Sequence, residues 1–282
     1  MIKPPLVSVI VPTYNSDATL AACLGSVRAQ TYEHIELIVV DNHSTDNTLE
    51  IAKSFTKHAY TRGPERSAQR NFGVSQASGE YVCIIDSDME LSPEVITQCV
   101  VALAGNPKSH GAIIPEESFG EGFWADCKRL ERSFYTGVDW MEAARFFDRE
   151  TYQELGGYDS NLVSGEDWDL SQRVAAIAPL ERVSALIFHN EGRLKLGRTL
   201  GKKYYYAKLI ARYLEKTNHA QQTSRQTNPL GRYALYLGQP AKLFRRPHVG
   251  IGMLFMKTME FGAGALGMFS AKRQTKEALA DE

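Results

Sequence analysis

The chain has 282 residues, of which 43% are hydrophobic and 23% are charged, so it can bury a core and is not an intrinsically disordered protein. Its four cysteines are far apart and form no CxxC or Cys/His cluster, so the sequence suggests neither a zinc site nor a disulfide framework and favours a reducing cytosol. The net charge of -1 hides an asymmetry, because residues 1–189 hold 15 Lys and Arg against 27 Asp and Glu, whereas residues 190–282 hold 17 against 6.

Strand-like and helix-like segments begin near the N-terminus. The β-branched run Val7–Val11 predicts a strand, and Ser16 or Asp17 can cap a helix whose apolar residues recur from Leu20 at helical spacing. The apolar run before Pro12 is shorter than the core of a signal peptide, so we expect a cytoplasmic protein.

The same alternation continues along the chain. The apolar run Ile35–Val40 ends at Asp41, and the stretch STDNTLEIAKSF then offers a cap and an apolar helix face. This alternation of strands and helices predicts a parallel sheet with helices on both faces. The run YVCIID is a later strand that ends at Asp86. Because ligands of open α/β sheets bind outside the carboxyl ends of the strands, we expect Asp41 and Asp86 to share one rim.

Two acidic pairs stand at predicted element ends. Asp86 and Asp88 follow the strand YVCI, and a turn before a helix near Ser92 is the local alternative to a functional role. Glu166 and Asp167 open a predicted helix after a Gly-Gly turn, where a simple cap and dipole interaction is the alternative.

Four motifs carry a family resemblance. VSVIVPTYN, ELIVVDNHSTDNT, RNFGVSQASGEYVCIIDSD and GEDWDLSQR, in this order over residues 5–190, resemble the successive signatures of family 2 glycosyltransferases. The resemblance implies an α/β GT-A fold, with a mostly parallel sheet flanked by helices. It also implies a nucleotide-sugar donor and a divalent metal, Mn²⁺ or Mg²⁺. We expect a catalytic domain over 1–190, with a nucleotide-binding half 1–90 and an acceptor half 91–190, followed by a basic, amphipathic helical region 191–282.

The resemblance also implies roles for the donor-side residues. Asp88 is the expected direct ligand of the metal, and Asp86 is expected to bind the metal, the ribose or a bound water. A hard cation between the carboxylates and a diphosphate would remove their mutual repulsion. Pro12, Tyr14 and Asp41 are expected at the nucleotide, where Asp41 can accept a hydrogen bond from a pyrimidine N–H.

Further roles concern the base and the metal. The resemblance places the general base at Asp167, with Glu166 binding the acceptor or positioning the helix. Arg70 is expected either to pair with phosphate or to hold an acidic motif in place, and a purely structural ion pair stays open. His189, at the end of the run LIFHNEG, is expected as a third metal ligand, with a surface or core histidine as the alternative.

The predicted reaction is inverting transfer of a sugar, by default from a UDP-sugar, to a hydroxyl of a glycan or lipid-linked glycan in cell-surface polysaccharide or glycolipid synthesis. Three alternatives are weighed against it. A polyprenyl-phosphate sugar synthase would need no base, because its acceptor is already an anionic phosphate. A glycoside hydrolase would need no nucleotide or metal motif. A sugar-nucleotide-binding module without activity would not need the acidic pairs.

The basic C-terminal region predicts a membrane contact. Its cations alternate with aromatic and aliphatic residues, and no nucleic-acid-binding signature accompanies them. We expect peripheral binding to the inner face of the cell membrane, through Tyr204–Tyr206, Leu243-Phe244, Met253–Met256 and the cations Arg245 and Arg246. The alternatives are a solvated helix face, acceptor binding and contact with another subunit.

A glycine pattern near the C-terminus has another explanation. Gly262, Gly264 and Gly267 spell GxGxxG, but no βαβ unit follows, so we interpret them as small residues that allow close helix packing or membrane contact. Lys257 and Glu260 interrupt the apolar stretch Val249–Ala271, which makes a membrane-spanning helix there unexpected.

Overall fold

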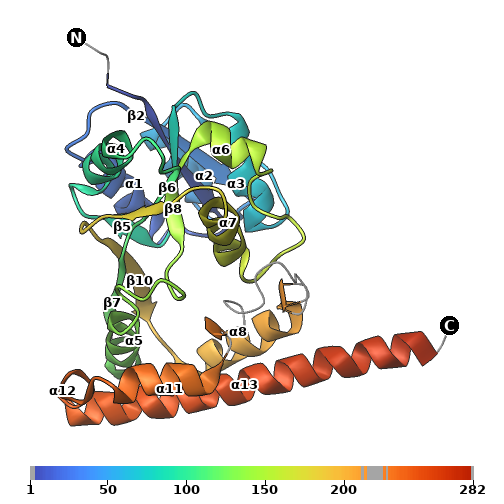
Figure 1. The fold of residues 1–282 in the computed structure, drawn as a ribbon. Helices are drawn as coiled ribbons and strands as arrows, with labels where there is room; N and C mark the ends of the chain where they lie inside the picture. The colour runs from blue at the N-terminus through green and yellow to red at the C-terminus, as the bar shows by residue number, and fades with distance from the viewer. Residues whose placement is uncertain (1–3, 211–212, 215–224, 227, 281–282) are drawn as a thin grey trace. The chain divides into compact units, whose positions relative to one another are not determined.

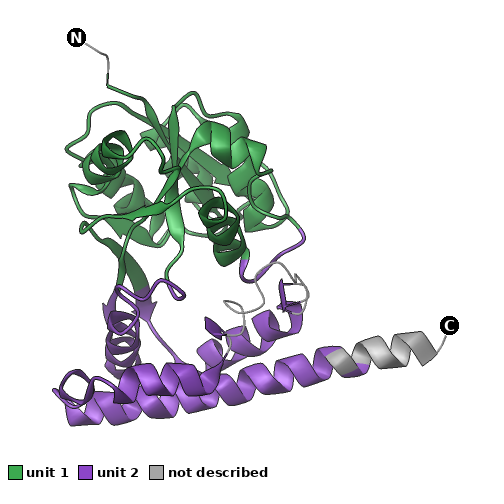
Figure 2. Ribbon diagram, in the orientation of Figure 1, with its two compact units in different colours: residues 1–117, 142–160, 166–190 green, residues 118–141, 161–165, 191–282 purple. Residues whose placement is uncertain are grey.

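The computed structural model describes residues 4–210, 213–214, 225–226 and 228–280 (Figure 1). Contacts within the chain group it into two compact units (Figure 2). Unit 1 comprises residues 1–117, 142–160 and 166–190, and unit 2 comprises residues 118–141, 161–165 and 191–282.

Unit 1 is built on a seven-stranded sheet with the order β3-β2-β1-β4-β8-β6-β9. Its strands are β1 (Val7–Thr13), β2 (Ile35–Asp41), β3 (Ala59–Thr61), β4 (Tyr81–Ile84), β6 (Gly111–Ile113), β8 (Ala144–Asp148) and β9 (Leu180–Arg182). The pairs β1–β2, β2–β3, β1–β4 and β6–β9 are parallel, whereas β8 runs antiparallel to both β4 and β6. The sheet is therefore mostly parallel, as predicted, with one inserted antiparallel strand.

Helices cover both faces of this sheet (Figure 1). They are α1 (Leu20–Arg28), α2 (Thr48–Phe55), α3 (Arg66–Ser75), α4 (Val95–Gly105), α6 (Arg149–Glu154) and α7 (Glu166–Ala175). Alternate residues of β1 point to opposite faces. Val7, Val9 and Val11 pack with α1, α2 and α4, whereas Ile10 packs with α3, α6 and α7. The two apolar layers bury both faces of the central strands and fix the sheet.

A second, three-stranded sheet has the order β5-β10-β7. Its strands are β5 (Met89–Leu91), β7 (Glu116–Glu121) and β10 (Ile187–Arg193). β5 and β10 are antiparallel, and His189 is paired with Met89. This pairing brings two segments that are about a hundred residues apart in the sequence to the same place.

The start of α1 differs from the prediction. The helix begins at Leu20 rather than directly after Ser16 or Asp17. The carbonyl of Ser16 accepts hydrogen bonds from the amides of Thr19 and Leu20, and its hydroxyl lies 2.8 Å from the hydroxyl of Ser87. Ser16 thus belongs to the loop after β1, because its side chain contacts Ser87 and does not cap the helix.

The helices of unit 2 pack around their own apolar cluster. Those whose bounds lie in the described part of the chain are α5 (Phe123–Ser133), α8 (Leu196–Leu209), α11 (Pro229–Leu237), α12 (Pro240–Leu243) and α13 (Pro247–Ala280). The buried pair Lys257 and Glu260, 2.6 Å apart, lies on α13, and Lys257 is also 2.7 Å from Glu131 of α5. The charges that interrupt the apolar stretch therefore join two helices inside this unit.

One glycine of the C-terminal pattern allows close helix packing, which confirms that interpretation for Gly267. A Cβ atom at Gly267 would lie 2.4 Å from the carbonyl oxygen of Tyr204 in α8, whereas one at Gly264 would lie 3.9 Å from Ala207, an ordinary contact. None of the described helices is long and apolar enough to cross a membrane.

Candidate active site

The carboxyl ends of β1, β2 and β4 meet at one rim of the large sheet. Thr13, the last residue of β1, is paired with Asp41, the last residue of β2. Ile10 is paired with Ile84 of β4, which places Asp86 just beyond the same edge. Asp41 ends one and Asp86 follows the other of the two strands that flank β1, so they lie at the same edge of the sheet, as predicted.

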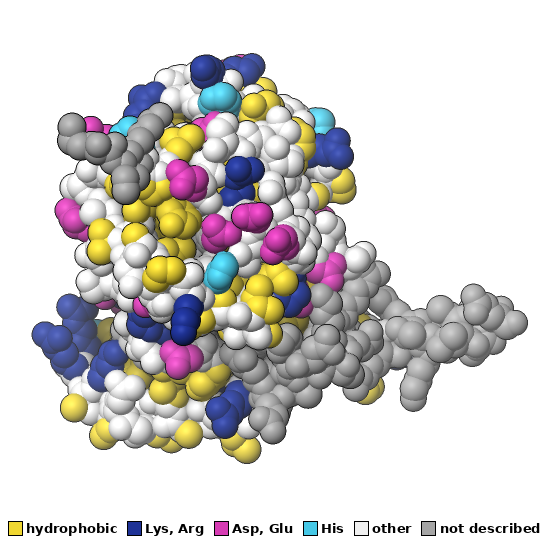
Figure 3. Space-filling model, turned by 45° about the horizontal axis from the view of Figure 1, so that its top comes forward, with side chains coloured by type: hydrophobic (Ala, Val, Ile, Leu, Met, Phe, Trp, Pro, Cys, Tyr) yellow, Lys and Arg dark blue, Asp and Glu magenta, His cyan; other side chains and the backbone are white. Residues whose placement is uncertain are grey.

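Asp88 and His189 form a polar pair beside this rim. The antiparallel pairing of β5 with β10 places them together, and the amide of Asn190 donates to the carbonyl of Asp88 at 2.8 Å. His189 Nε2 lies 3.5 Å from Asp88 Oδ2, and the two side chains are 20% and 41% exposed. Figure 3 shows a histidine next to a group of acidic side chains on the surface. Both side chains can therefore reach a ligand from solvent.

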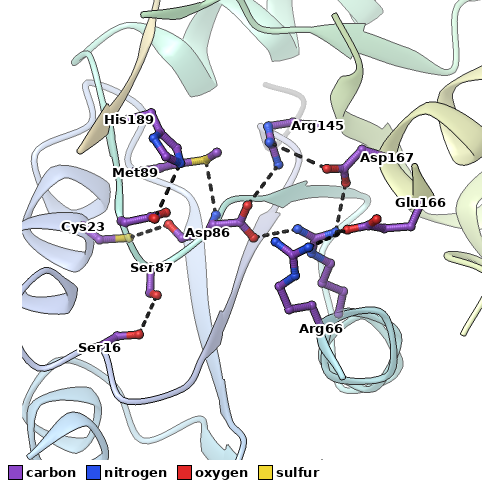
Figure 4. Close-up of polar contacts among 12 residues, drawn as sticks. Ser16, Cys23, Arg66, Asp86, Ser87, Met89, Arg145, Glu166, Asp167 and His189 are labelled. Atoms are coloured by element: carbon purple, nitrogen blue, oxygen red, sulfur yellow. Dashed lines mark hydrogen bonds and ion pairs between the residues drawn. The ribbon is translucent and has the colours of Figure 1, made fainter. Parts of the chain in front are cut away.

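Asp86 faces arginines instead of this pair (Figure 4). Its Oδ1 accepts a hydrogen bond from Arg70 Nη2 at 2.6 Å, and its Oδ2 lies 3.9 Å from Arg145 Nη1. Burial alone would raise the pKa of Asp86, but the guanidinium groups of Arg70 and Arg145, with Arg66, hold that pKa well below its usual range. Asp86 is thus an anion at neutral pH.

Arg70, on α3, is fully buried and binds three carboxylates. Besides Asp86, it contacts Asp167 at 2.9 Å and Glu166 at 3.3 Å through Nη1. Its guanidinium also lies over the ring of Tyr158, 4.8 Å from the centroid. In this structure the guanidinium holds acidic groups in place, and its contact with a phosphate stays a prediction.

Glu166 and Asp167 begin α7, as predicted, but they have different environments. Glu166 is 4% exposed and lies 3.3 Å from Arg66 and from Arg70. Burial and the neighbouring Asp167 raise the pKa of Glu166. The side chain of Asp167 is 25% exposed, so it is the more accessible carboxylate of the two. A reacting hydroxyl can therefore reach Asp167 more easily than Glu166.

Arg145 was missed by the sequence reasoning. It lies in β8, is 6% exposed, and donates from Nε to Glu116 at 2.6 Å. Its Nη2 lies 3.9 Å from Asp167, and in Figure 4 its side chain points toward both Asp86 and Asp167. A signal existed in the sequence, since Arg145 is a cation inside the otherwise apolar run ARFF.

The side chain of Asn71, next to Arg70 on α3, binds the segment that follows α6. Asn71 Oδ1 accepts from the amide of Tyr158 at 2.9 Å and from the Tyr152 hydroxyl at 2.6 Å, while Nδ2 donates to the carbonyl of Tyr158 at 2.7 Å. Arg173 of α7 donates to the carbonyl of Gly157 at 2.6 Å. The Gly-Gly turn is thereby tied to both helices that carry the charged side chains.

We expect Gly157→Ala to be far more destabilising than Gly156→Ala. Both glycines have positive φ, +65° and +75°, which would cost an alanine about 1 kcal/mol or more. A Cβ at Gly157 would also lie 2.5 Å from Asn71 Oδ1, whereas nothing lies within 4 Å at Gly156. Urea denaturation should show an additional loss of about 1–3 kcal/mol for Gly157→Ala. Equal losses would show that the Asn71 contact is easily displaced.

The predicted nucleotide-binding residues lie in and after β1 and β2. Pro12 is buried in β1, and Tyr14, just after it, is 59% exposed. The buried Asp41 accepts from the hydroxyls of Thr13 at 3.0 Å and Ser44 at 2.5 Å, and from the amide of Ser44 at 2.9 Å. Asp41 thus holds the bend after β2 through Ser44 and the end of β1 through Thr13, and a contact of Asp41 with a base stays a prediction.

The donor set suits a divalent cation only in part. Among the residues that the structure describes, no group of three His, Cys, Asp or Glu side chains is arranged around one metal position. Asp88 and His189 offer one oxygen and one nitrogen donor 3.5 Å apart, a combination that Mn²⁺ accepts. They fit a cation that takes its other ligands from a bound diphosphate and water, as Mg²⁺ and Mn²⁺ commonly do.

The fold of the chain is the GT-A fold of glycosyltransferases. The mannosyltransferase PcManGT from Pyrobaculum calidifontis, solved with GDP-Man and Mn²⁺, aligns with 95% of this chain and 88% of its own at a TM-score of 0.65 and 17% identity. Residues 1–349 of TarS from S. aureus, solved with UDP-GlcNAc, align with 95% of this chain and 92% of their own at a TM-score of 0.54 and 16% identity. At this identity the likeness establishes the fold alone.

The sequence comparison gives the family. Residues 8–154, more than half of the chain, match the profile of Glycosyl transferase family 2, and the chain belongs to this family. GlyG, a glycosyltransferase from Streptococcus pneumoniae, is 42% identical over 91 residues, which cover 29% of this chain and 30% of GlyG. AglE, a glycosyltransferase from Haloferax volcanii, is 28% identical over 60% of this chain and 61% of its own. The matches thus span less than two thirds of these relatives.

Proposed function

We propose that the protein is an inverting, metal-dependent glycosyltransferase that moves a sugar from a nucleotide diphosphate, by default UDP, to a hydroxyl of a glycan or lipid-linked glycan. The observation that carries the proposal is the link made by Arg70, which joins Asp86 after β4 to Asp167 at the start of α7. The proposed metal-binding segment and the candidate base are thereby held at one rim. A further relative supports a lipid-linked acceptor: the Campylobacter jejuni GalNAc(5)-diNAcBac-PP-undecaprenol beta-1,3-glucosyltransferase is 36% identical over 31% of this chain.

We assign the acid–base chemistry to Asp167. Its partly exposed carboxylate would accept the proton of the acceptor hydroxyl as that oxygen attacks the anomeric carbon. The hydrogen bond from Arg70 fixes the orientation of this carboxylate, and Glu166 holds the start of α7 against Arg66 and Arg70. Attack opposite the leaving diphosphate inverts the anomeric centre.

We assign the donor to the ends of β1, β2 and β4. Pro12, Tyr14 and Asp41 would border the nucleotide. Asp88 and His189 would hold Mn²⁺ or Mg²⁺, whose chemistry is to offset the negative charge that develops on the leaving nucleoside diphosphate. Asp86, because it is bound to Arg70, would act on the ribose or a bound water more readily than on the cation.

The basic C-terminal part supports a further proposal, peripheral contact with an anionic membrane. Residues 190–282 carry 17 Lys and Arg against 6 Asp and Glu, and each cation near an anionic leaflet contributes about 1 kcal/mol.

The experiment that tests the reaction is hydrolysis and transfer of UDP-sugars with Mn²⁺ and with chelator. We expect turnover with Mn²⁺ and its loss with chelator, because the diphosphate would lack its counter-ion. Binding of a nucleotide sugar without any turnover would instead support a binding module, and transfer to a polyprenyl phosphate but to no hydroxyl would support the synthase alternative.

We expect Asp88→Ala to remove most of the Mn²⁺-dependent part of nucleotide affinity, and His189→Ala to reduce it less, since an oxygen ligand contributes more to a hard cation. Thermal shift with UDP, titrated with Mn²⁺, measures both, because a ligand that binds only the folded state raises its apparent stability. Glu94→Ala, at an exposed acid before α4, is the matched control and should titrate like the wild type. If the Mn²⁺ titration of Asp88→Ala were the same as that of the wild type, Asp88 would not be a metal ligand.

A further inference from the structure

Helix α13 carries apolar side chains on two sides. One side packs inside unit 2, where Val249, Met253 and Met256 are buried together with Cys127 and Phe134 of the α5 segment. This burial contradicts the prediction that Leu243, Met253 and Met256 insert into a membrane, because all three are 0% exposed.

The other side of α13 is exposed. Five large apolar residues, which we call the exposed stripe, are 42–70% exposed: Ile251 at 62%, Phe255 at 51%, Met259 at 42%, Leu266 at 65% and Phe269 at 70%. At 3.6 residues per turn, their spacing of four, four, seven and three residues keeps them within an arc of about 80°. The stripe is about 27 Å long at 1.5 Å per residue. An apolar surface of this length is typical of an interaction site.

The charges around the exposed stripe are of one sign. From residue 225 to residue 273 the sequence holds eight Lys and Arg but one acidic residue, Glu260, and this carboxylate is buried against Lys257. Arg245 and Arg246 are exposed just before α13, and Arg273 is exposed four residues after Phe269. The stripe thus lies in a segment whose exposed charges are cationic.

We propose that the exposed stripe of α13 inserts into the interface of an anionic phospholipid bilayer, with the helix parallel to the membrane plane. An apolar face accompanied by cations is the composition of helices that bind in this way. Lipid fits better than the same stripe of a second copy, since a contact of stripe with stripe would bring two cationic segments together. The inference rests on the proposed membrane contact and specifies the residues that make it. Vesicle binding is measured without catalysis, so a negative result would leave the transferase assignment intact.

Co-sedimentation with vesicles tests the proposal on the full chain. The probes are vesicles of phosphatidylcholine with phosphatidylglycerol, and vesicles of phosphatidylcholine alone. We expect binding to the anionic vesicles that weakens with salt. The combined variant Ile251→Ser, Phe255→Ser and Phe269→Ser should lower the partition coefficient at least about tenfold, because three large apolar side chains would no longer be transferred from water into the bilayer.

A matched control is Val101→Ser with Ile177→Ser, two side chains of unit 1 that are 65% and 61% exposed, and it should bind like the wild type. Arg245→Glu with Arg246→Glu should also weaken binding, without touching the stripe. Unchanged vesicle binding of the stripe variant would overturn the proposal. So would a lipid-free dimer that the stripe variant converts to a monomer with no loss of vesicle binding, since the stripe would then cover a second copy.

Discussion

Asp167→Asn is expected to lower sugar transfer by about 10²–10⁴-fold while nucleotide binding survives. The amide oxygen of Asn can still accept the hydrogen bond that Arg70 donates to Asp167 at 2.9 Å, so the local geometry should persist. An amide cannot take the proton of the acceptor hydroxyl, and this lost step is the source of the lower rate.

The measurement is kcat for transfer together with the Kd of the nucleotide in the presence of Mn²⁺. Glu94→Gln provides the matched control, because it removes one carboxylate of unit 1 at an exposed position before α4. If nucleotide affinity and transfer both fell in Asp167→Asn, Asp167 would have a structural role instead. If the transfer rate stayed near that of the wild type, Asp167 would not be the general base.

The parts of the site that could be predicted follow strand ends and one helix start. The apolar runs before Asp41 and Asp86 are strand-sized, and parallel strands place such ends at one rim. The start of α7 at Glu166 could also be predicted from the sequence, since acidic residues favour a helix N-terminus and apolar residues follow at helical spacing. These features depend on local sequence, so a single sequence contains them.

Strand direction and long-range ion pairs could not be predicted in the same way. β8 is inserted antiparallel between β4 and β6, and nothing in the run ARFFD fixes its direction or its neighbours. The meeting of Arg145 with Asp86 and Asp167 depends on this insertion. The arginine was therefore missed although its position in an apolar run was visible.

The orientation of α13 shows a second limit. Its apolar residues occur on two sides of the helix, so the sequence pattern does not tell which side packs against α5 and which faces solvent. Met253 and Phe255 are only two positions apart in the same apolar run, yet Met253 is buried and Phe255 is exposed. The neighbours of the helix decide this, and they are brought to it by tertiary packing.

Arg70→Met is expected to lower the free energy of unfolding by about 3–5 kcal/mol, because removal of one partner leaves the others as buried, uncompensated charges. Arg70 is 0% exposed and contacts Asp86, Glu166 and Asp167, so Met fills part of its volume but leaves these carboxylates without that cation. Urea denaturation measures the loss. Arg62→Met is the matched control, since this exposed guanidinium lies 5.7 Å from the ring centroid of Phe72 and should contribute no more than about 1 kcal/mol.

A double-mutant cycle separates the charge effect from lost packing. If the uncompensated carboxylates cause the instability, Glu166→Gln should recover part of the stability lost in Arg70→Met, because one buried charge is removed, although Glu166→Gln alone lowers stability. Glu166 is the partner of choice because it is 4% exposed and burial already raises its pKa, so its ionised form depends on Arg66 and Arg70. Strictly additive losses would mean that Arg70 stabilises the site through its packing on Tyr158 and not through its charge.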